Sequence, residues 1–193
     1  MTTNVKFAKV RPDAIIPSKR PEDAGFDLYA NFVEDYIEIQ PHETKLIPTG
    51  IASACSQEYA LVLFERGSTG SKGMARRAGI VDSSFRGEIF VGITNTTDTF
   101  LYISKLSNEE LIRAVHPEGV HLYQYDERGV QINHYDMSNE QILAGWTVYP
   151  YSKAIAQALV LPVPEVEIEE ISYEELQAIP SERGLGKLGS SNK

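Results

Sequence analysis

Short apolar runs, separated by Pro, Gly, Asn and Asp, dominate the first hundred residues of the chain. They recur about every ten residues, which is typical of a β-sandwich or β-barrel and not of alternating strands and helices. One further apolar run follows near the C-terminal end and stops at two prolines, Pro162 and Pro164. The pattern therefore predicts strands at 5–10, 27–30, 36–39, 45–47, 59–64, 79–81, 88–93 and 156–163.

Residues 101–150 have a different sequence pattern, with signals for helix starts and a turn. Ser107 with Glu110, and Ser138 with Gln141, have the spacing of capping boxes, so each indicates the start of a short helix. Between them, Asp126–Gly129 predicts a hairpin turn. We therefore expect a β domain over 1–178 that carries a small α+β insertion at 101–150. Residues 179–193 have no apolar period, which predicts a flexible C-terminal arm.

Composition and charge narrow the class of protein. The 193 residues are 42% hydrophobic and 23% charged, as in an ordinary folded domain, and the net charge of −9 argues against direct nucleic-acid binding. Because no apolar run reaches 18 residues, we expect no membrane span. The single cysteine excludes an internal disulfide framework and, together with an N-terminus that lacks a signal-peptide pattern, predicts a cytoplasmic protein. The four histidines lack the spacing of a structural zinc site.

Four short segments carry candidate chemistry. The loop from Arg66 to Gly73 combines glycines, hydroxyls and cations that suit phosphate oxygens, but its order is not that of a P-loop. A second segment places Asp82 directly after two apolar strand formers and before the aromatic Phe85. Asp27 stands at the start of a strand, and a glycine-rich tail follows Arg183. Each segment by itself also fits an ordinary turn or an unstructured tail.

The order of these segments is more specific than any one of them. Residues 24–30 resemble the A-G-x-D-L-x-A first motif of the homotrimeric dUTP pyrophosphatase (dUTPase) family, and 66–68 resemble its R-S-[SG] second motif. Residues 79–88 are similar to the G-[VI]-[IV]-D-x-x-Y-x-G third motif. Ala156 and Gln157 fit the end of the fourth motif, G-x-R-x-A-Q, and 183–191 fit the fifth. The segment 101–150 then resembles the insertion of phage or Firmicutes members, between motifs three and four.

The resemblance implies an all-β, jelly-roll-like subunit that forms homotrimers and hydrolyses dUTP to dUMP and pyrophosphate with Mg²⁺, keeping uracil out of DNA. It implies that Asp82 is the general base for the attacking water and that Asp27 holds a water on the Mg²⁺. The Gly79 backbone would read uracil, and Phe85 would stack under the deoxyribose. The remaining implied substrate-binding residues are Arg66, Gly67, Ser68, Gln157, Arg183, Leu188 and Ser190.

Several positions depart from the family motifs. Phe85 replaces a tyrosine, Gly67 replaces a serine, and Ala154 stands where the fourth motif has arginine, with Lys153 one place earlier. Leu188 replaces the phenylalanine that covers the base, so we expect weaker closure of the tail over the nucleotide. These changes leave the strictness for dUTP over other dNTPs open.

Two other functions stay open. A dCTP deaminase shares the fold, but its catalytic glutamate would fall on Gly92. A nucleotide-gated regulatory or binding protein would use the same site together with a protein partner at 101–150. Retention of Asp27, Arg66, Asp82 and Arg183 favours catalysis.

Overall fold

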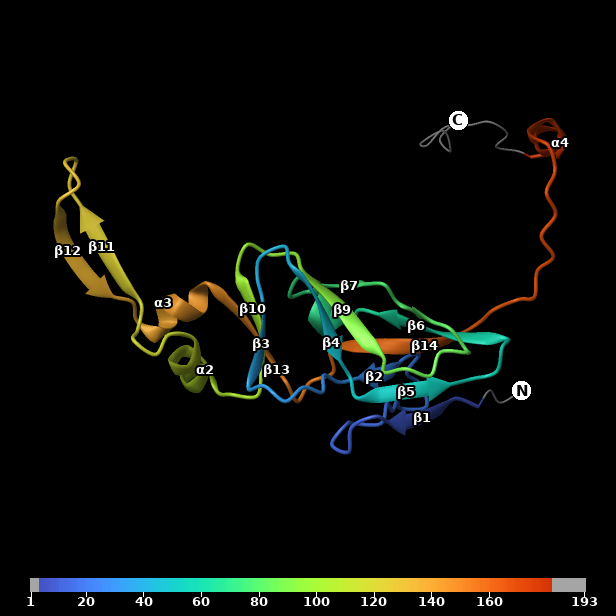
Figure 1. Cartoon of the computed structure of the whole chain (residues 1–193), viewed down its shortest axis with the longest axis horizontal. Coiled ribbons are helices and arrows are strands. Elements are labelled where there is room, and N and C mark those ends of the chain that lie inside the picture. Colours follow the sequence, from blue (N-terminus) through green and yellow to red (C-terminus); the bar gives the residue numbers. More distant parts are fainter. Residues whose placement is uncertain (1–3, 182–193) are drawn as a thin grey trace. The chain divides into compact units, whose positions relative to one another are not determined.

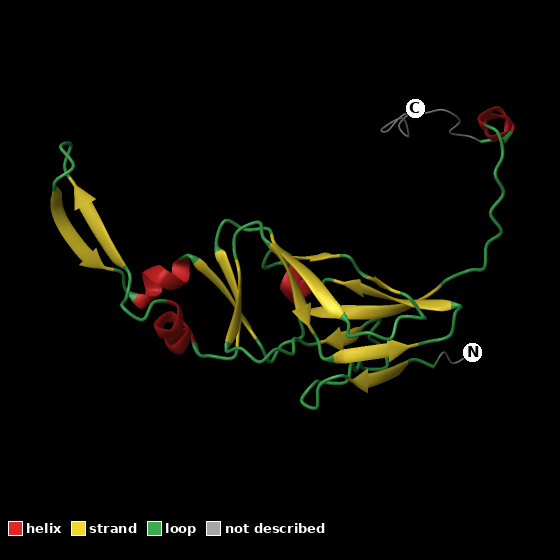
Figure 2. Cartoon of the chain, viewed as in Figure 1, coloured by secondary structure: helices red, strands yellow, loops and turns green. Residues whose placement is uncertain are grey.

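Short strands carry most of the chain between Lys6 and Pro162 in the computed structural model, which describes residues 4–181 (Figures 1 and 2). The contacts divide the chain into two compact units, residues 1–163 and 164–193. All the sheets found among the described residues belong to the first unit. The expected all-β fold is confirmed by this arrangement, since the helices are few and short.

One sheet brings together strands that lie far apart in the sequence. Its order is β2-β14-β6-β8, and all its pairs are antiparallel. Gln157 pairs with Asp27 on one side and with Phe64 on the other, two residues before Arg66. This register gathers candidate residues from three separate motifs at one end of the sheet. The strands are β2 (Phe26–Leu28), β14 (Ala156–Pro162), β6 (Tyr59–Phe64) and β8 (Ile80–Val81).

Three smaller sheets complete the scaffold. Their orders are β4-β9-β7, β13-β10-β3 and β1-β5. Many of their apolar side chains are buried, and each buried Leu, Ile or Val stabilises the fold by about 1.5–3 kcal/mol. The strands are β1 (Lys6–Lys9), β3 (Tyr36–Ile39), β4 (Thr44–Pro48), β5 (Ile51–Ala54), β7 (Met74–Arg77), β9 (Phe90–Asn95), β10 (Phe100–Ser104) and β13 (Trp146–Pro150).

A single apolar core lies between the sheets. Its fully buried members come from most strands of the scaffold, including Leu28, Ile39, Leu61, Val91 and Leu101. β5 and β7 contribute to the buried set although the sequence pattern did not predict them, because β5 is rich in small residues and β7 ends in two arginines. Pairing with β1 and β9 defines both strands.

The ends of the expected insertion are strands of the β13-β10-β3 sheet. β10 pairs with β3, and β13 lies parallel to β10, so Leu101, Ile103 and Tyr149 are buried in the common core. The excursion from the scaffold is therefore residues 105–145, narrower than the expected 101–150. Sequence could not reveal this, because parallel pairing joins two strands that are separated by the whole excursion.

The excursion itself contains two helices and a hairpin. The expected capping boxes are present: Ser107 caps α2 (Asn108–Val115) and Ser138 caps α3 (Asn139–Ala144). β11 (His121–Tyr125) and β12 (Gln131–Asp136) form the expected hairpin (Figure 1). Every residue of both strands is exposed.

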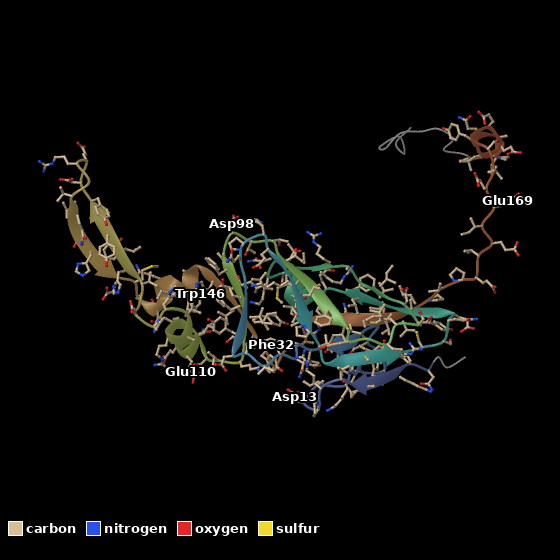
Figure 3. The ribbon with its side chains drawn as sticks, viewed as in Figure 1. Asp13, Phe32, Asp98, Glu110, Trp146 and Glu169 are labelled. Carbon is tan, nitrogen blue, oxygen red and sulfur yellow. The ribbon has the colours of Figure 1, made fainter. Side chains whose placement is uncertain are left out.

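An aromatic column attaches the excursion to the scaffold. His116, at the end of α2, stacks on Trp146 of β13 with ring centroids 5.6 Å apart, and the Trp146 ring centroid lies 4.5 Å from that of Tyr102 on β10. Figure 3 shows Trp146 where the helices meet the strands, and Glu110 on α2. Both helices of the excursion have buried side chains, Leu111 and Ile112 in α2 and Ile142 in α3. Neither strand of the β11–β12 hairpin has a buried residue.

The second unit, described from Pro164 to Ser181, contains one short helix, α4 (Tyr173–Ala178), capped by Ser172. The sequence pattern predicts that the β domain ends at 178, whereas the contacts divide the chain at 163. The assignment of 1–178 to one domain and of 179–193 to an arm stays a prediction. Within residues 4–181, the structure contains no helix with the length and apolar character needed to cross a membrane.

Candidate functional site

Asp27 and Arg66 form an ion pair at one end of the β2-β14-β6-β8 sheet. The Arg66 Nε atom lies 2.9 Å from Asp27 Oδ1, and Arg66 Nη2 donates to Asp27 Oδ2 at 3.3 Å. Both side chains are about one third exposed, so each keeps a face toward solvent. A cavity of about 520 Å³ opens beside them; we call it the Asp27 cleft. It is lined by Ser18, Lys19, Arg20, Asp23, Ala24, Gly25, Asp27, Arg66 and Gln157.

The turn after β6 fixes Arg66. Thr69 is fully buried, and its hydroxyl accepts from the Arg66 backbone N–H at 3.0 Å, which closes the short helix α1 (Gly67–Gly70). Arg66 Nη1 donates to the Ser68 hydroxyl at 3.4 Å. A Cβ atom at Gly67 would meet nothing within 4 Å, so the backbone there is open to an approaching anion. The structure therefore keeps Gly67 and Ser68 beside Arg66, and of these three residues Arg66 lines the cleft.

Gln157 completes this side of the cleft. Its Nε2 donates to the Glu65 carbonyl at 2.8 Å, so the side chain is fixed across the sheet. A Cβ atom at Gly25 would lie only 2.7 Å from Gln157 Oε1, which explains the glycine at that position. Asp27, Arg66 and Gln157, which the sequence placed in three motifs, thus meet at one cavity.

The loop that forms the rim of the cleft was not predicted from the sequence. Lys19, Arg20 and Asp23 line the cavity directly before the first motif. The signal that could have identified them is the pair of adjacent cations, Lys19 and Arg20, a few residues before that motif begins. The same cavity carries two carboxylates, those of Asp23 and Asp27.

Asp82 and Phe85 lie at a second cavity, of about 270 Å³, which we call the hairpin pocket. The turn after β8 is closed by a bond from the Phe85 N–H to the Asp82 carbonyl at 3.0 Å, and both residues are exposed. The pocket is lined by Leu63, Ala78, Gly79, Ile80, Val81, Asp82, Phe85, Glu88, Ile89 and Phe90. The sequence-based candidates Gly79, Asp82 and Phe85 are therefore together.

The backbone of the hairpin pocket is held in an unusual conformation. Ala78 has a φ of 46°, in the left-handed region that a residue with a Cβ rarely adopts. A Cβ at the next residue, Gly79, would displace the Arg76 guanidinium and would lie 3.0 Å from the Leu63 carbonyl oxygen, which is tighter than an ordinary contact. The Gly79 carbonyl accepts from the Leu63 N–H at 2.7 Å, which ties the pocket to β6. Such local strain is common at binding sites.

Glu65, directly after β6, links the frames of the two cavities. Its carboxylate accepts from the Arg76 N–H at 2.9 Å, and its carbonyl accepts from Gln157. The pKa of Glu65 is lowered, first by a bond from its own backbone N–H, and then by the Arg76 N–H and the charges of Arg76 and Arg77, against the effect of burial. Glu65 is therefore a charged, fixed part of the frame at neutral pH.

The two cavities have complementary chemistry and, among the described residues, share no lining residue. The Asp27 cleft contains the cations Lys19, Arg20 and Arg66, which suit an anion. The charged residues of the hairpin pocket are Asp82 and Glu88, and its other walls are apolar or aromatic. An anionic group would bind in the first cavity and an uncharged ring in the second.

Three predicted site residues, Arg183, Leu188 and Ser190, lie outside the described residues. Of the departures from the fourth motif, Ala154 is buried and Lys153 is exposed. Neither of these two residues lines the Asp27 cleft.

Comparisons with known proteins agree on one family. The dUTPase family model matches residues 11–108, about half of the chain. A deoxyuridine 5'-triphosphate nucleotidohydrolase of Nautilia profundicola is 30% identical over 193 residues, covering 98% of this chain and 99% of the relative. Another, from Mycolicibacterium gilvum, is 31% identical over 138 residues and covers 67% of this chain and 88% of the relative.

Solved structures show the same fold. A mutant dUTPase of Staphylococcus bacteriophage 80alpha with dUpNHpp has a TM-score of 0.65 at 18% identity, covering 98% of this chain and 99% of that chain. The dUTPase from phage phi11 of S. aureus, described for its species-specific insert, has a TM-score of 0.57 at 18% identity, covering 87% of this chain and 96% of that chain.

Proposed function

Because the chain belongs to the dUTPase family, we propose that it hydrolyses dUTP to dUMP and pyrophosphate. The observation that carries this proposal is the pair of complementary cavities. One holds Asp27, Arg66 and Gln157 for an anionic chain, and the other holds Asp82 beside Phe85 for a nucleoside. A triphosphate joined to a nucleoside is a substrate that needs both.

We assign the general base to Asp82. Its exposed carboxylate accepts a proton from water, whose oxygen attacks the α-phosphorus while the bond to the bridging oxygen breaks and pyrophosphate leaves. A positioned base of this kind contributes roughly 10²–10⁴ in rate. Arg66, with Ser68 and the open backbone at Gly67, offers donors to phosphate oxygens on which charge develops, and Gln157 holds the adjacent wall.

The residues of the Asp27 cleft fit Mg²⁺ held through water. Mg²⁺ prefers oxygen ligands and keeps several of its waters. Asp27 Oδ2 accepts one hydrogen bond from Arg66 and Oδ1 lies in ion-pair contact with it, so both oxygens keep capacity to accept from a metal-bound water. Among residues 4–181, no cluster of three or more His, Cys, Asp or Glu side chains is placed to hold a metal ion. When bound, Mg²⁺ would neutralise charge on the substrate phosphates.

The hairpin pocket would select the nucleoside. We assign recognition of the uracil edge to the backbone beside Gly79, which lines this pocket, and cytosine would be excluded by donor–acceptor mismatch. Phe85 is 46% exposed, and its ring lies against Gly87, where a Cβ would meet the ring at 2.5 Å. The exposed ring would be available to stack under a deoxyribose, and we propose that this contact excludes a 2′-hydroxyl.

We propose a homotrimer in which the hairpin pocket of one subunit faces the Asp27 cleft of another. Among the described residues the two cavities share no lining residue, which supports this arrangement. Large apolar side chains such as Ile80, Leu46 and Val33 are well exposed on the single chain, as expected of surfaces that a neighbouring subunit covers. Arg183 and Ser190 would contact the phosphates and Leu188 would cover the base. A cytoplasmic location completes the proposal and rests on the sequence features given above.

A dCTP deaminase is less compatible with the structure. Its catalytic glutamate would fall on Gly92 of β9, where a Cβ would lie 2.6 Å from the Arg77 carbonyl oxygen of the neighbouring strand. The backbone leaves no space for a side chain at this position.

A second function is a nucleotide-gated interaction with a protein partner, in addition to catalysis. The exposed β11–β12 hairpin favours such a protein contact, because five of its large apolar or aromatic side chains are at least half exposed. They are Tyr123, Tyr125, Val130, Ile132 and Tyr135. The narrowed excursion, 105–145, is the segment we assign to such a contact.

The deciding experiment measures pyrophosphate release from each dNTP, with and without Mg²⁺, and ammonia release from dCTP. We expect Mg²⁺-dependent pyrophosphate from dUTP and no ammonia. Absence of pyrophosphate from dUTP would refute the proposed activity, and ammonia from dCTP would favour the deaminase.

A further inference from the structure

The rim of the Asp27 cleft is a loop, 18–23, that precedes the first family motif. Its start is fixed, because Ser18 forms a β-bridge with Asp27 and its carbonyl accepts from the Asp27 N–H at 3.0 Å. The two cations that follow Ser18 therefore stand next to the Asp27–Arg66 pair and line the same cavity.

Lys19 holds the loop in shape. Its ammonium donates to the carbonyl of Asp23 at 2.7 Å, and to those of Arg20 and Pro21 at 3.3 and 3.4 Å. It also lies 5.8 Å from the centre of the Phe26 ring. All three ammonium protons thus have acceptors within the loop, so Lys19 closes the loop on itself and is not the group that would receive an anion.

Arg20 is differently placed. Its guanidinium binds the Asp23 carboxylate through two parallel bonds of 2.9 Å, from Nε to Oδ2 and from Nη2 to Oδ1. The Arg20 side chain is 85% exposed and that of Asp23 is 36% exposed. An exposed ion pair of this kind contributes little to stability, so it can be exchanged for a better partner. A phosphate offers the same bidentate geometry with more charge.

Among the cations of the cleft, Arg20 is the one most available to exchange its partner for a phosphate. Of the three lining cations, Lys19 is engaged with carbonyl groups, and Arg66, the proposed phosphate donor, is also paired with Asp27. The position where the family motif has a further arginine is the buried Ala154. Arg20 is far more exposed than Arg66, so its carboxylate partner holds it less firmly.

We propose that Arg20 is a substrate-binding residue that leaves Asp23 to bind the phosphate groups beyond the α-phosphate. This inference rests on the proposed function and extends it. The α-phosphate is attached to the sugar, which the hairpin pocket would hold, whereas the Asp27 cleft is a separate cavity. Arg20 therefore distinguishes a nucleoside triphosphate from its monophosphate product.

The test is calorimetric binding of dUpNHpp, dUMP and inorganic tripolyphosphate, each with Mg²⁺, to the full chain and to Arg20→Gln. Loss of a bidentate charge-assisted contact should weaken dUpNHpp and tripolyphosphate by about tenfold or more. Binding of dUMP should stay within about twofold of the parent, because the α-phosphate lies elsewhere. Arg20→Lys keeps the charge but loses the planar fork, so its affinities should fall between the two.

Two further variants sharpen the result. Arg128→Gln is the matched control. Arg128 also pairs with a neighbouring carboxylate, that of Asp126, and is 86% exposed, but it lies in the turn between β11 and β12, outside both cavities. It should leave all three affinities unchanged. Asp23→Asn releases Arg20 and should preserve or tighten triphosphate binding.

Equal affinities of Arg20→Gln and the parent for tripolyphosphate would overturn the inference. So would an equal loss for dUMP, or a marked loss in Asp23→Asn, since the intact ion pair would then be what the site needs. These outcomes differ from failure of the proposed function, which is the absence of dUTP hydrolysis by the parent, because tripolyphosphate binding is measured without turnover.

Discussion

The side-chain amide of Gln157 lies directly against the α-carbon of Gly25, so that a Cβ there would approach Gln157 Oε1 to 2.7 Å. The two residues come from distant parts of the chain and meet because β14 pairs with β2. The glycine of the first motif is thus explained by the glutamine of the fourth.

Gly25→Ala should therefore displace Gln157 and disturb the cleft. We expect kcat/KM for dUTP to fall on the order of tenfold to a hundredfold, because small misplacements of positioning groups have effects of this size. The measurement is steady-state pyrophosphate release. Gly70→Ala is the control, since its Cβ would meet only Glu65 Cβ, at an ordinary 3.8 Å. Full activity of Gly25→Ala would show that the position of Gln157 does not matter.

Asp82→Asn should abolish hydrolysis while leaving dUpNHpp binding nearly intact. The change keeps the shape of the side chain and removes the base, and we expect a loss of roughly 10²–10⁴ in kcat. Single-turnover hydrolysis and calorimetric binding separate the two effects. Turnover within a few-fold of the parent would mean that another group is the base.

Removal of the β11–β12 hairpin should leave the enzyme intact. A short Gly/Ser linker in place of residues 120–137 deletes strands that are exposed throughout and keeps both helices. We expect an unchanged melting temperature, the subunit assembly of the parent and full dUTP hydrolysis. Loss of any of these would place the hairpin within the core architecture.

Removal of the whole excursion should be more costly. The strands that flank it, β10 and β13, are parallel, so the replacement for 107–144 must cross back over the sheet and needs about a dozen residues. Deleting 107–144 removes His116, which stacks on Trp146, and so exposes the Trp146 ring. We expect activity to persist and the melting temperature to fall by about 2–4 °C for each kcal/mol of stability lost. An unchanged melting temperature would show that this packing is not stabilising.

His121 should titrate above its ordinary range. Its Nδ1 lies 2.6 Å from Asp136 Oδ1 and its Nε2 lies 2.9 Å from the Glu118 carbonyl, and both oxygens are acceptors, which favours the doubly protonated ring. The pKa of His121 is raised, first by the bond to Asp136 and then by the Glu118 carbonyl and the Asp136 charge.

The resulting stabilisation of the hairpin is fully present below the unfolded pKa of about 6.5 and is lost as the pH rises through the higher folded value. An NMR titration of the His121 ring checks this. Asp136→Asn should return the pKa toward the ordinary value, and an identical titration curve in that variant would contradict the assigned cause.

Local patterns were enough to identify many elements. The apolar runs at 36–39 and 59–64 match β3 and β6, and both capping boxes open helices where Ser107 and Ser138 predicted them. These features depend on neighbouring residues, since side-chain period and helix caps are set within a few positions. The proximity of Asp82 and Phe85 could be predicted for the same reason, because both lie in one turn.

Tertiary structure alone decided which distant residues meet. The register of β14 with β2 and β6 joins Gln157 to Asp27 and to the strand that leads to Arg66, and the parallel pairing of β10 with β13 returns both ends of the expected insertion to the core. It also placed Arg20 at the cleft, because the Ser18–Asp27 bridge turns its loop toward the cavity. Such contacts depend on strand pairing between segments far apart in the chain, and no periodicity within a single segment records which partner or register it will take.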